Sequence, residues 1–356
     1  MYQEKLLTIM NRLRTIVKDC TNAEDAMAQF APLQEEALSL LPAEDPQRYD
    51  VEATFLEAAG DAWFKFKDIA NAEINYKKMV HTAVEAYKKD PQKYDFRLGF
   101  SYYKLAAFYR ALLGFNQLLP SPKTLSEKEQ TVYQATEKFY QNAIGCTMEN
   151  AKKGMVKILE FHALCLSELL VFYAAVGNYD RAVSCGKDSV KLEKSLYEKY
   201  DDAAHSYRLA GRMNNLATLY MFQKEPQLAA ETLEDAIFAL EEHQKEDPAA
   251  FGLVLAKSYI SLASCYHQCP EEKDLTDDTY EKGLSCMLAA NNASAGRFTN
   301  DVLTSYIVIG DHYKKTNRLD LARQRYGLAL KLATILHAQT KNPAYQTTIE
   351  HLKNAL

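Results

Sequence analysis

The stretch that decides the fold is NNLATLYMFQKEPQLAAETLEDA, residues 214–236. Within it a small residue, Ala217, is followed three places later by an aromatic one, Tyr220, and nine places after that by a second small residue, Ala229. Leu233 and Ala236 follow at steps of four and three. Such steps place side chains on one face of an α-helix. The gap of nine spans a helix end, a turn and a new helix start, so the stretch predicts an antiparallel helix pair.

The same five-point spacing recurs along the chain. Three further copies keep it without a shift: Gly60, Trp63, Ala72, Tyr76 and Met79; Leu170, Tyr173, Ala182, Gly186 and Ser189; Gly310, Tyr313, Ala322, Tyr326 and Ala329. Two more copies, around Tyr109 and Tyr266, carry insertions, the first being a long loop at 114–130. We expect the small residue to let the paired helix approach closely and the aromatic ring to fill the gap that remains between the two helices. Repetition of one helix pair is typical of a helical repeat array.

This spacing resembles the tetratricopeptide repeat (TPR). The copy at 214–236 is similar to the longer repeats of kinesin light chain, and Gly310, Tyr313, Ala322 and Tyr326 are close to the general consensus. The resemblance covers about residues 51–343. It implies an all-α fold, a right-handed superhelix (α-solenoid) of about seven antiparallel helix pairs. Lys67, Lys224 and the segment 110–130 depart from the pattern, because they replace the expected turn glycine or short turn.

We expect a degenerate N-terminal helical hairpin at 1–50, which caps the stack because an end repeat has a neighbour on one side only. TPR-like repeats follow at 51–343 (about 51–95, 96–150, 151–203, 204–249, 250–295 and 296–343), with a helical tail at 344–356. A helix-turn-helix DNA reader is the alternative for 1–50. The segment is neither basic nor built around a short glycine-containing turn, which disfavours that alternative.

The composition is that of a globular, helix-rich protein: 47% of the 356 residues are hydrophobic, and there are only 13 Gly and 10 Pro. The net charge of −5 does not favour nucleic acid or an anionic membrane surface as a partner. No apolar run approaches the ~20 residues of a membrane span, and no signal-peptide pattern is visible, so we expect a cytoplasmic protein. The seven scattered cysteines suit reduced thiols.

No motif indicates catalysis. The sequence has no Gly-rich phosphate loop, nucleophile elbow or paired-His metal motif. Cys265, His267, Cys269 and Cys286 form the most enzyme-like constellation, but their spacing is not that of a zinc site, and we interpret the cysteines as core or interface thiols. The charge run at 241–247 is interpreted as a solvated helix end. We therefore expect no catalytic residue, no metal and no cofactor.

The resemblance implies that first helices line a concave groove. The residues that it places there are Tyr103, Lys104, Arg110, Glu168, Asn214, Asn215, Lys257, Ser261, Ser264, His267, Asp311 and Lys314. Asn215 is the strongest candidate, because an amide can both donate to and accept from an extended ligand backbone.

The predicted function is therefore a non-catalytic scaffold that binds a protein or peptide. The alternatives are a peptide-responsive regulatory switch and, less favoured, an all-helical enzyme. Nucleic acid and membranes are not expected partners. A homodimer through the apolar ends of the stack is left open.

Overall fold

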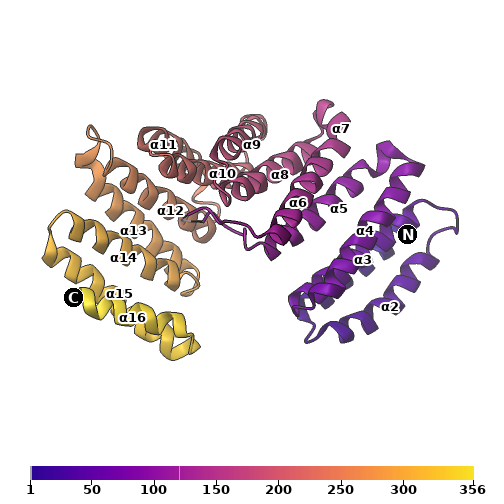
Figure 1. Cartoon of the computed structure of the whole chain (residues 1–356), viewed down its shortest axis with the longest axis horizontal. Helices are drawn as coiled ribbons and strands as arrows, with labels where there is room; N and C mark the ends of the chain where they lie inside the picture. Colours follow the sequence, from indigo (N-terminus) through magenta and orange to yellow (C-terminus); the bar gives the residue numbers. More distant parts are fainter. Residues whose placement is uncertain (1, 120) are drawn as a thin grey trace. The chain divides into compact units, whose positions relative to one another are not determined.

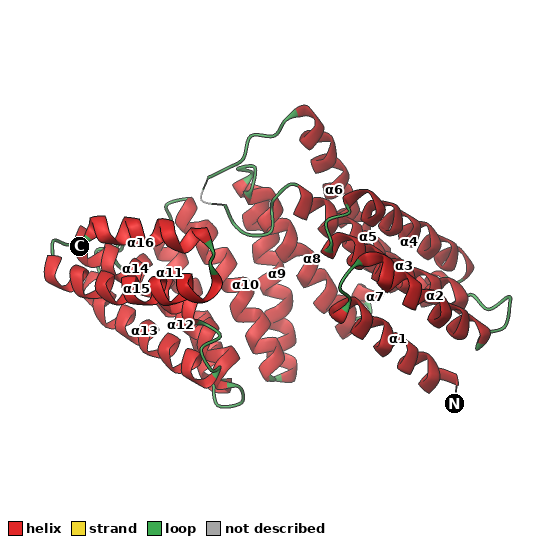
Figure 2. Cartoon of the chain, turned by 90° about the horizontal axis from the view of Figure 1, so that it is seen from below, coloured by secondary structure: helices red, strands yellow, loops and turns green. Residues whose placement is uncertain are grey.

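The computed structural model describes residues 2–119 and 121–356, and among them it contains helices and no strand. Figure 2 shows these helices joined by loops. Their bounds are α1 (Tyr2–Asp19), α2 (Ala23–Ser39), α3 (Gln47–Lys65), α4 (Ile69–Lys89), α5 (Pro91–Leu112), α6 (Glu127–Cys146), α7 (Met148–Lys152), α8 (Val156–Ala174), α9 (Tyr179–Tyr200), α10 (Ala203–Phe222), α11 (Pro226–His243), α12 (Pro248–Tyr266), the 3₁₀ turn η1 (Lys273–Leu275), α13 (Thr276–Ala293), α14 (Thr299–Lys315), α15 (Leu319–Thr340) and α16 (Pro343–Ala355).

Consecutive helices pack as pairs, as Figure 1 shows for α3 with α4 and for α12 with α13. The same packing joins α1 to α2, α5 to α6, α10 to α11 and α14 to α15. First helices also pack on the second helix of the preceding pair, as α5 does on α4 and α14 on α13. Helices α8 and α9 follow one another across a short turn in the same order along the chain. The predicted all-α repeat fold is confirmed. The chain divides into two compact units, up to Cys185 and from Gly186, here called the N-terminal and C-terminal units.

The first helix of four pairs ends in the same way. The aromatic residue of the five-point spacing is here called the aromatic anchor. The residue four places after it adopts a left-handed conformation: Lys67 (φ 65°), Gly177 (φ 79°), Lys224 (φ 62°) and Asn317 (φ 60°). The next backbone N–H then donates to the carbonyl of the anchor itself, as from Glu225 to Tyr220 at 2.8 Å. This bond defines a Schellman cap. The lysines that depart from the consensus therefore occupy the turn-glycine position and adopt its geometry.

Proline sets the start of several helices. Helices α5, α12 and α16 each begin with Pro, which costs no hydrogen bond at a first helical position. The preceding Asp90, Asp247 and Asn342 accept a hydrogen bond from the new helix through their side chains. An Asp-Pro or Asn-Pro pair thus separates two helices and also caps the second.

The aromatic anchors act between pairs as well as within them. The Tyr109 hydroxyl donates to Glu73 at 2.6 Å, on the second helix of the preceding pair. The same link joins Tyr173 to Glu137, Tyr266 to Glu234 and Tyr313 to Glu281. Our sequence interpretation placed the ring only in the gap within its own pair. The polar tip of the side chain instead ties neighbouring pairs together.

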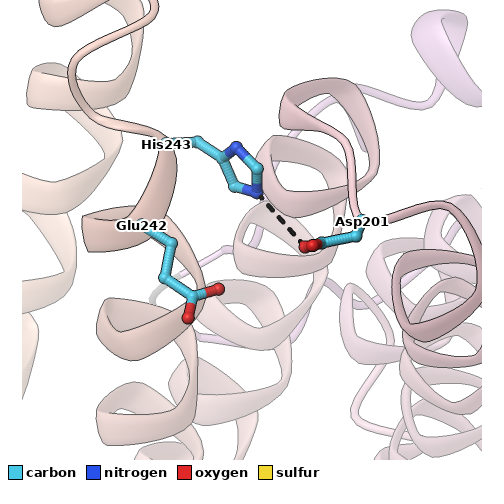
Figure 3. Close-up of side chains that lie close together, drawn as sticks. All are labelled: Asp201, Glu242 and His243. Atoms are coloured by element: carbon cyan, nitrogen blue, oxygen red, sulfur yellow. Dashed lines mark ion pairs between the residues drawn. The ribbon is translucent and has the colours of Figure 1, made fainter.

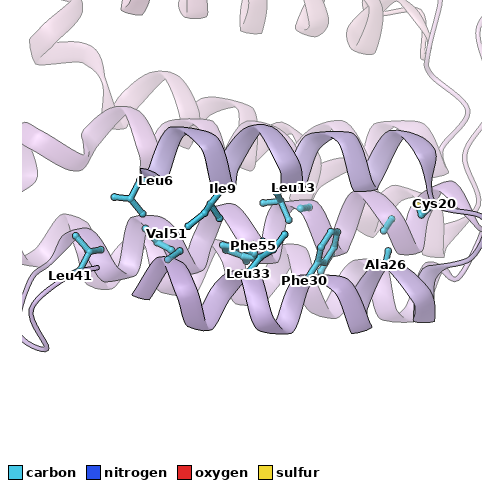
Figure 4. Packing of buried hydrophobic residues seen from close by; sticks show 14 residues of the cluster. Leu6, Ile9, Leu13, Cys20, Ala26, Phe30, Leu33, Leu41, Val51 and Phe55 are labelled. Atoms are coloured by element: carbon cyan, nitrogen blue, oxygen red, sulfur yellow. The ribbon is translucent and has the colours of Figure 1, made fainter. Parts of the chain in front are cut away.

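The N-terminal hairpin has its own core, shown in Figure 4. Leu6, Ile9 and Leu13 of α1 face Phe30 of α2 and Phe55 of α3, and the Phe30 and Phe55 rings meet edge to face at 6.4 Å. Ile9 lies at the centre of this stripe, whereas Met10 and Val17 of the same helix are only partly buried. The hairpin is therefore packed onto the first repeat through α3.

The long loop of the N-terminal unit runs from the end of α5 to Ser126. Phe115 is fully buried beside Phe172 of α8, and the Lys123 N–H donates to the carbonyl of Ala175 at 2.7 Å. A capping box of Ser126 and Glu129 then starts α6. This helix ends at Cys146, and the chain restarts as α7 at Met148.

One described helix, α12, is long and apolar enough to cross a membrane by length and composition. It packs against α13 and α11, and Phe251, Leu255 and Leu262 on its faces are buried. Its apolar residues therefore belong to the interior of the C-terminal unit.

Candidate binding grooves

The C-terminal unit has a groove of about 430 Å³, here called the C-terminal groove. The first helices of three consecutive pairs, α10, α12 and α14, supply all its residues except one from α13. The lining residues are Gly211, Asn214, Asn215, Thr218, Val254, Lys257, Ile260, Ser261, Met287, Asp301, Thr304, Ser305 and Val308. Four of the predicted residues, Asn214, Asn215, Lys257 and Ser261, are brought together here.

The two asparagines differ in what they contact. The Asn214 amide donates to Ser258 Oγ at 2.8 Å and to the carbonyl of Ala210 at 2.9 Å, which ties α10 to α12. Asn215 is partly exposed in the groove, and its amide has no hydrogen bond to any described residue. Asn214 is therefore committed to the fold, whereas the donor and acceptor of Asn215 are available to a ligand.

The groove carries one cation and one anion, and they are paired. Lys257 Nζ of α12 lies 2.8 Å from Asp301 Oδ1 of α14. The Lys257 side chain is 53% exposed and that of Asp301 30%, so water screens the pair. Val254, Ile260 and Val308 add apolar surface beside it. The groove is thus amphipathic without an excess of either charge.

The other four predicted residues of this unit lie outside the groove lining. The Ser264 hydroxyl is bonded to the Tyr280 hydroxyl at 2.9 Å, and Asp311 accepts from Tyr326 at 2.6 Å. The His267 ring meets His312 edge to face at 5.0 Å. Lys314 is exposed. Three of the four are therefore engaged in contacts between helices.

Sequence reasoning missed Thr218, Asp301, Thr304 and Ser305. It assigned groove positions close to the small residue of each first helix, which suits α10. On α14 the groove lies one to two turns nearer the N-terminus, away from Gly310 and along the same helical face. Thr304 and Asp301 lie seven and ten residues before the predicted Asp311, on the same helical face, but the spacing does not say how far along α14 the groove runs.

The N-terminal unit has a second groove of about 730 Å³, here called the N-terminal groove, which the sequence did not predict. It is lined by α1, α3 and α5, with Gln47 at the start of α3 and Lys157 from α8. The lining residues are Tyr2, Gln3, Met10, Leu13, Arg14, Val17, Gln47, Asp50, Thr54, Glu57, Ala58, Asp61, Lys93, Tyr94, Phe96, Arg97, Phe100 and Lys157.

An ion-pair network occupies one wall of the N-terminal groove. Arg97 of α5 pairs with Asp50 and donates to Thr54 at 2.8 Å, and Lys104 lies 2.8 Å from Asp61 and 3.5 Å from Glu57. Burial raises the pKa of Glu57, although Lys104 and Arg97 oppose that effect. Burial by itself would lower the pKa of Lys104, but Asp61 and Glu57 outweigh it and the pKa is raised. The predicted groove residue Lys104 is therefore a fixed, charged link between α5 and α3.

The remaining predicted residues of this unit are engaged within it. Arg110 lies 2.6 Å from Glu168, with the two side chains 12% and 23% exposed, which joins α5 to α8. Tyr103 packs against Phe161 and Tyr140 and does not line the N-terminal groove. Arg110 and Lys104 are therefore neutralised by carboxylates and do not form an open basic patch.

The cysteine constellation does not come together as a metal site. Cys265 and Cys269 are buried, and burial raises the pKa of Cys265 to about 12, well above that of a reactive thiol. Cys286 is half-buried and its pKa is raised by burial too. Across residues 2–119 and 121–356, one group of three His and carboxylate side chains lies close enough to hold a metal ion: Asp201, Glu242 and His243.

No protein-family model matches this chain, and no curated protein does. Solved structures are similar to it. BtubC (BKLC) from P. vanneervenii aligns with a TM-score of 0.55 and 20% identity, over 76% of this chain and 93% of BtubC. Aspartyl phosphate phosphatase F from Bacillus subtilis aligns with a TM-score of 0.55 and 12% identity, over 98% of this chain and 78% of that one. RapI in its apo form aligns with a TM-score of 0.50 and 12% identity, over 92% of this chain and 97% of RapI. The fold is thus that of TPR-like helical-repeat proteins, as the spacing predicted.

Proposed function

We propose that this protein is a non-catalytic scaffold that binds an extended protein segment or peptide in the C-terminal groove. The observation that carries the proposal is Asn215, whose free amide lies among the first helices of three successive pairs. An extended peptide exposes a backbone N–H and C=O at each residue, and one carboxamide can satisfy one of each. A groove built from repeated first helices suits a chain-like ligand.

The rest of the groove supplies the complementary contacts. The Ser305 and Thr304 hydroxyls donate to carbonyls of their own helix, so their oxygens still have lone pairs that can accept from a ligand. Val254, Ile260 and Val308 offer apolar surface for ligand side chains. Apolar walls with a few convergent polar groups are the usual composition of a binding site.

The charges indicate which ligands are disfavoured. Recognition of a free C-terminal carboxylate needs unpaired cations near the asparagine. Lys257 is paired with Asp301, while Lys104 and Arg110 are held by carboxylates of the N-terminal unit. We therefore propose an internal segment of balanced charge as the ligand, not a chain terminus.

A pair of crosslinking variants tests this function. A photo-crosslinking amino acid is placed at Thr304 in the groove and, as the control, at Lys331 on the exposed part of α15. In extracts of the native cell, the Thr304 variant should capture a discrete partner that the Lys331 variant does not. Adding Asn215→Ala should reduce capture. The same adducts from both positions, or capture unaffected by Asn215→Ala, would contradict the proposal.

Once a bound segment is mapped by mass spectrometry, its affinity gives a quantitative prediction. Asn215→Ala should weaken binding of the synthetic segment by about 1–3 kcal/mol, which is the loss of one or two hydrogen bonds. Ligand fluorescence polarisation measures this. Asn214→Ala is a poor control because it breaks a contact between helices, whereas Glu231→Gln on the exposed face of α11 should leave affinity unchanged.

A catalytic role has less support. The titratable residues of the C-terminal groove are Lys257 and Asp301, which pair with each other. The phosphatase among the similar structures shares 12% identity, which relates the folds alone. We propose a cytoplasmic location on the basis of composition. A peptide-responsive switch is the alternative, and it requires that the bound segment change the arrangement of the helix pairs.

A further inference from the structure

Three side chains of the C-terminal unit converge outside the groove. Asp201 lies in the turn between α9 and α10, while Glu242 and His243 are at the end of α11. Their nitrogen and carboxylate oxygens lie within 4.8 Å of one another. Figure 3 shows Asp201 reaching toward the His243 ring, with Glu242 extending from the same helix as the histidine. His243 belongs to the charge run that the sequence indicated as a solvated helix end, yet it is only 9% exposed.

The hydrogen bonds of His243 fix which ring nitrogen is available. Nδ1 lies 2.6 Å from Glu246 Oε1, and a carboxylate can only accept, so Nδ1 carries the proton. In the neutral ring Nε2 then holds a lone pair. Nε2 is buried and has no hydrogen-bond partner among the described residues. Its nearest charged partner is Asp201 Oδ1 at 3.8 Å, beyond hydrogen-bond reach. A histidine that binds a metal through one ring nitrogen usually donates the N–H of its other ring nitrogen to a carboxylate, as His243 does to Glu246.

The second carboxylate is supported in the same manner. Glu242 Oε2 accepts from the Tyr197 hydroxyl of α9 at 2.5 Å, which leaves its other oxygen unused by that bond. Asp201 adopts a left-handed backbone conformation (φ 46°), and its side chain is 81% exposed, so it can turn toward a ligand without disturbing the core. Two of the three candidate ligands thus have a partner that orients them.

We infer that Asp201, Glu242 and His243 bind one divalent cation of the zinc class. One imidazole nitrogen with two carboxylates suits Zn²⁺, whereas Mg²⁺ and Ca²⁺ prefer oxygen alone. A cation about 2.1 Å from each ligand fits between atoms 3.8 Å apart, and the exposed Asp201 can close the wider separations. The bound ion would cross-link the α9–α10 turn to the end of α11 and thereby stabilise the C-terminal unit.

Metal titration of the full chain tests this site. Chelator-treated protein is titrated with ZnCl₂, and separately with MgCl₂, by calorimetry and by thermal unfolding. One Zn²⁺ per chain should bind saturably and raise the unfolding temperature, and MgCl₂ should do neither. Asp201→Asn, at an exposed side chain that the fold does not need, should weaken Zn²⁺ binding at least about tenfold. His243→Gln should do the same, and Glu246→Gln should weaken binding while all three ligands remain.

Glu241→Gln is the matched control, because Glu241 is adjacent in sequence but contacts Tyr259 and not the triad. It should leave the Zn²⁺ affinity unchanged. The chain has 8 His and 7 Cys, so zinc could bind elsewhere. Equal affinity in the wild type, Asp201→Asn and His243→Gln, or sulfur ligands in the zinc X-ray absorption spectrum, would overturn the assignment. So would the absence of saturable binding.

Discussion

Two glycines of first helices lie directly under a tyrosine ring. A Cβ at Gly310 would come within 2.7 Å of Tyr326 Cε1, and one at Gly60 within 2.8 Å of Tyr76 Cε1. Each ring then donates its hydroxyl to an aspartate beside the glycine, Tyr326 to Asp311 and Tyr76 to Asp61. The glycine is therefore required by the closeness of the ring and not by backbone conformation.

Gly310→Ala should lower the free energy of unfolding by about 1–3 kcal/mol, because the hydrogen-bonded Tyr326 ring cannot retreat from an added methyl group. Urea denaturation followed by circular dichroism measures the change. Gly327→Ala is the control, since a Cβ there meets nothing within 4 Å, and it should stabilise the helix by up to about 1 kcal/mol. If the two variants have equal stability, the Tyr326 ring does not explain the glycine.

The tyrosine-to-glutamate links between pairs are testable by a double-mutant cycle. Burial and the Glu234 carboxylate raise the pKa of Tyr266, so the phenol stays protonated and keeps donating. The coupling between Tyr266→Phe and Glu234→Gln should be about 0.5 kcal/mol, at the low end for a hydrogen bond because Glu234 is exposed. Additive effects of the two changes would show that the link contributes nothing to stability.

At the scale of elements, the junction of α12 with α14 contains a histidine pair. His312 Nε2 lies 2.8 Å from Asp277 Oδ1 and from Arg318 Nη2, while His267 approaches it from α12. Burial lowers the pKa of His267 below its ordinary value of 6.5, and His312, Lys273, Lys315 and Arg318 lower it further. The folded state therefore favours neutral His267 in this junction.

This shift has a definite consequence for stability against pH. The unfolded chain binds a proton at His267 more readily than the folded chain does. The stabilisation of the folded state by neutral His267 is therefore complete above pH 6.5 and is lost as the pH falls through that value. Burial of His162 in α8 acts in the same direction. The urea midpoint should fall between pH 7.5 and 5.5, and His267→Gln should flatten that slope. Exposed His351→Gln should leave the slope unchanged; equal slopes in all three proteins would refute the assignment.

At the scale of the whole molecule, the chain consists of two compact units with a groove in each. Helix pairs of a repeat array contact mainly their neighbours, so stability is approximately a sum of local terms. A change in one unit is therefore expected to act mainly within it. A substitution in the C-terminal groove of α10, α12 and α14 is thus expected to leave the N-terminal groove of α1, α3 and α5 unchanged.

Hydrogen exchange can measure how far a local change spreads. Gly310→Ala should speed amide exchange in α14, α15 and α16, which share one hydrophobic core, and leave α3 and α4 unchanged. Mass spectrometry of proteolytic fragments resolves these helices. Uniform acceleration across both units would instead indicate that the chain unfolds as one cooperative body.

The candidate sites show where sequence reasoning stops. Asn215 could be identified because the resemblance places groove residues close to the small residue of each first helix, and Asn215 lies two places before Ala217. Asp301 and Thr304 could not, because the position of the groove along α14 depends on how the pairs are stacked. Lys104 and Arg110 have groove-like spacing, but their partners Asp61 and Glu168 lie tens of residues away and no local pattern indicates them.

Residue spacing by itself determined that this chain is a row of paired helices, because a small residue, a ring and a small residue at fixed steps are compatible with one local packing. It also located four of the turns, since the left-handed cap falls four places after Trp63, Tyr173, Tyr220 and Tyr313. Only the tertiary structure decided which polar groups are free and which are consumed. Asn214 and Asn215 are adjacent, identical in type and both line the groove, yet Asn214 is bonded to Ser258 whereas the Asn215 amide has no hydrogen bond among the described residues. Availability depends on contacts between distant segments, and those are set when the pairs stack.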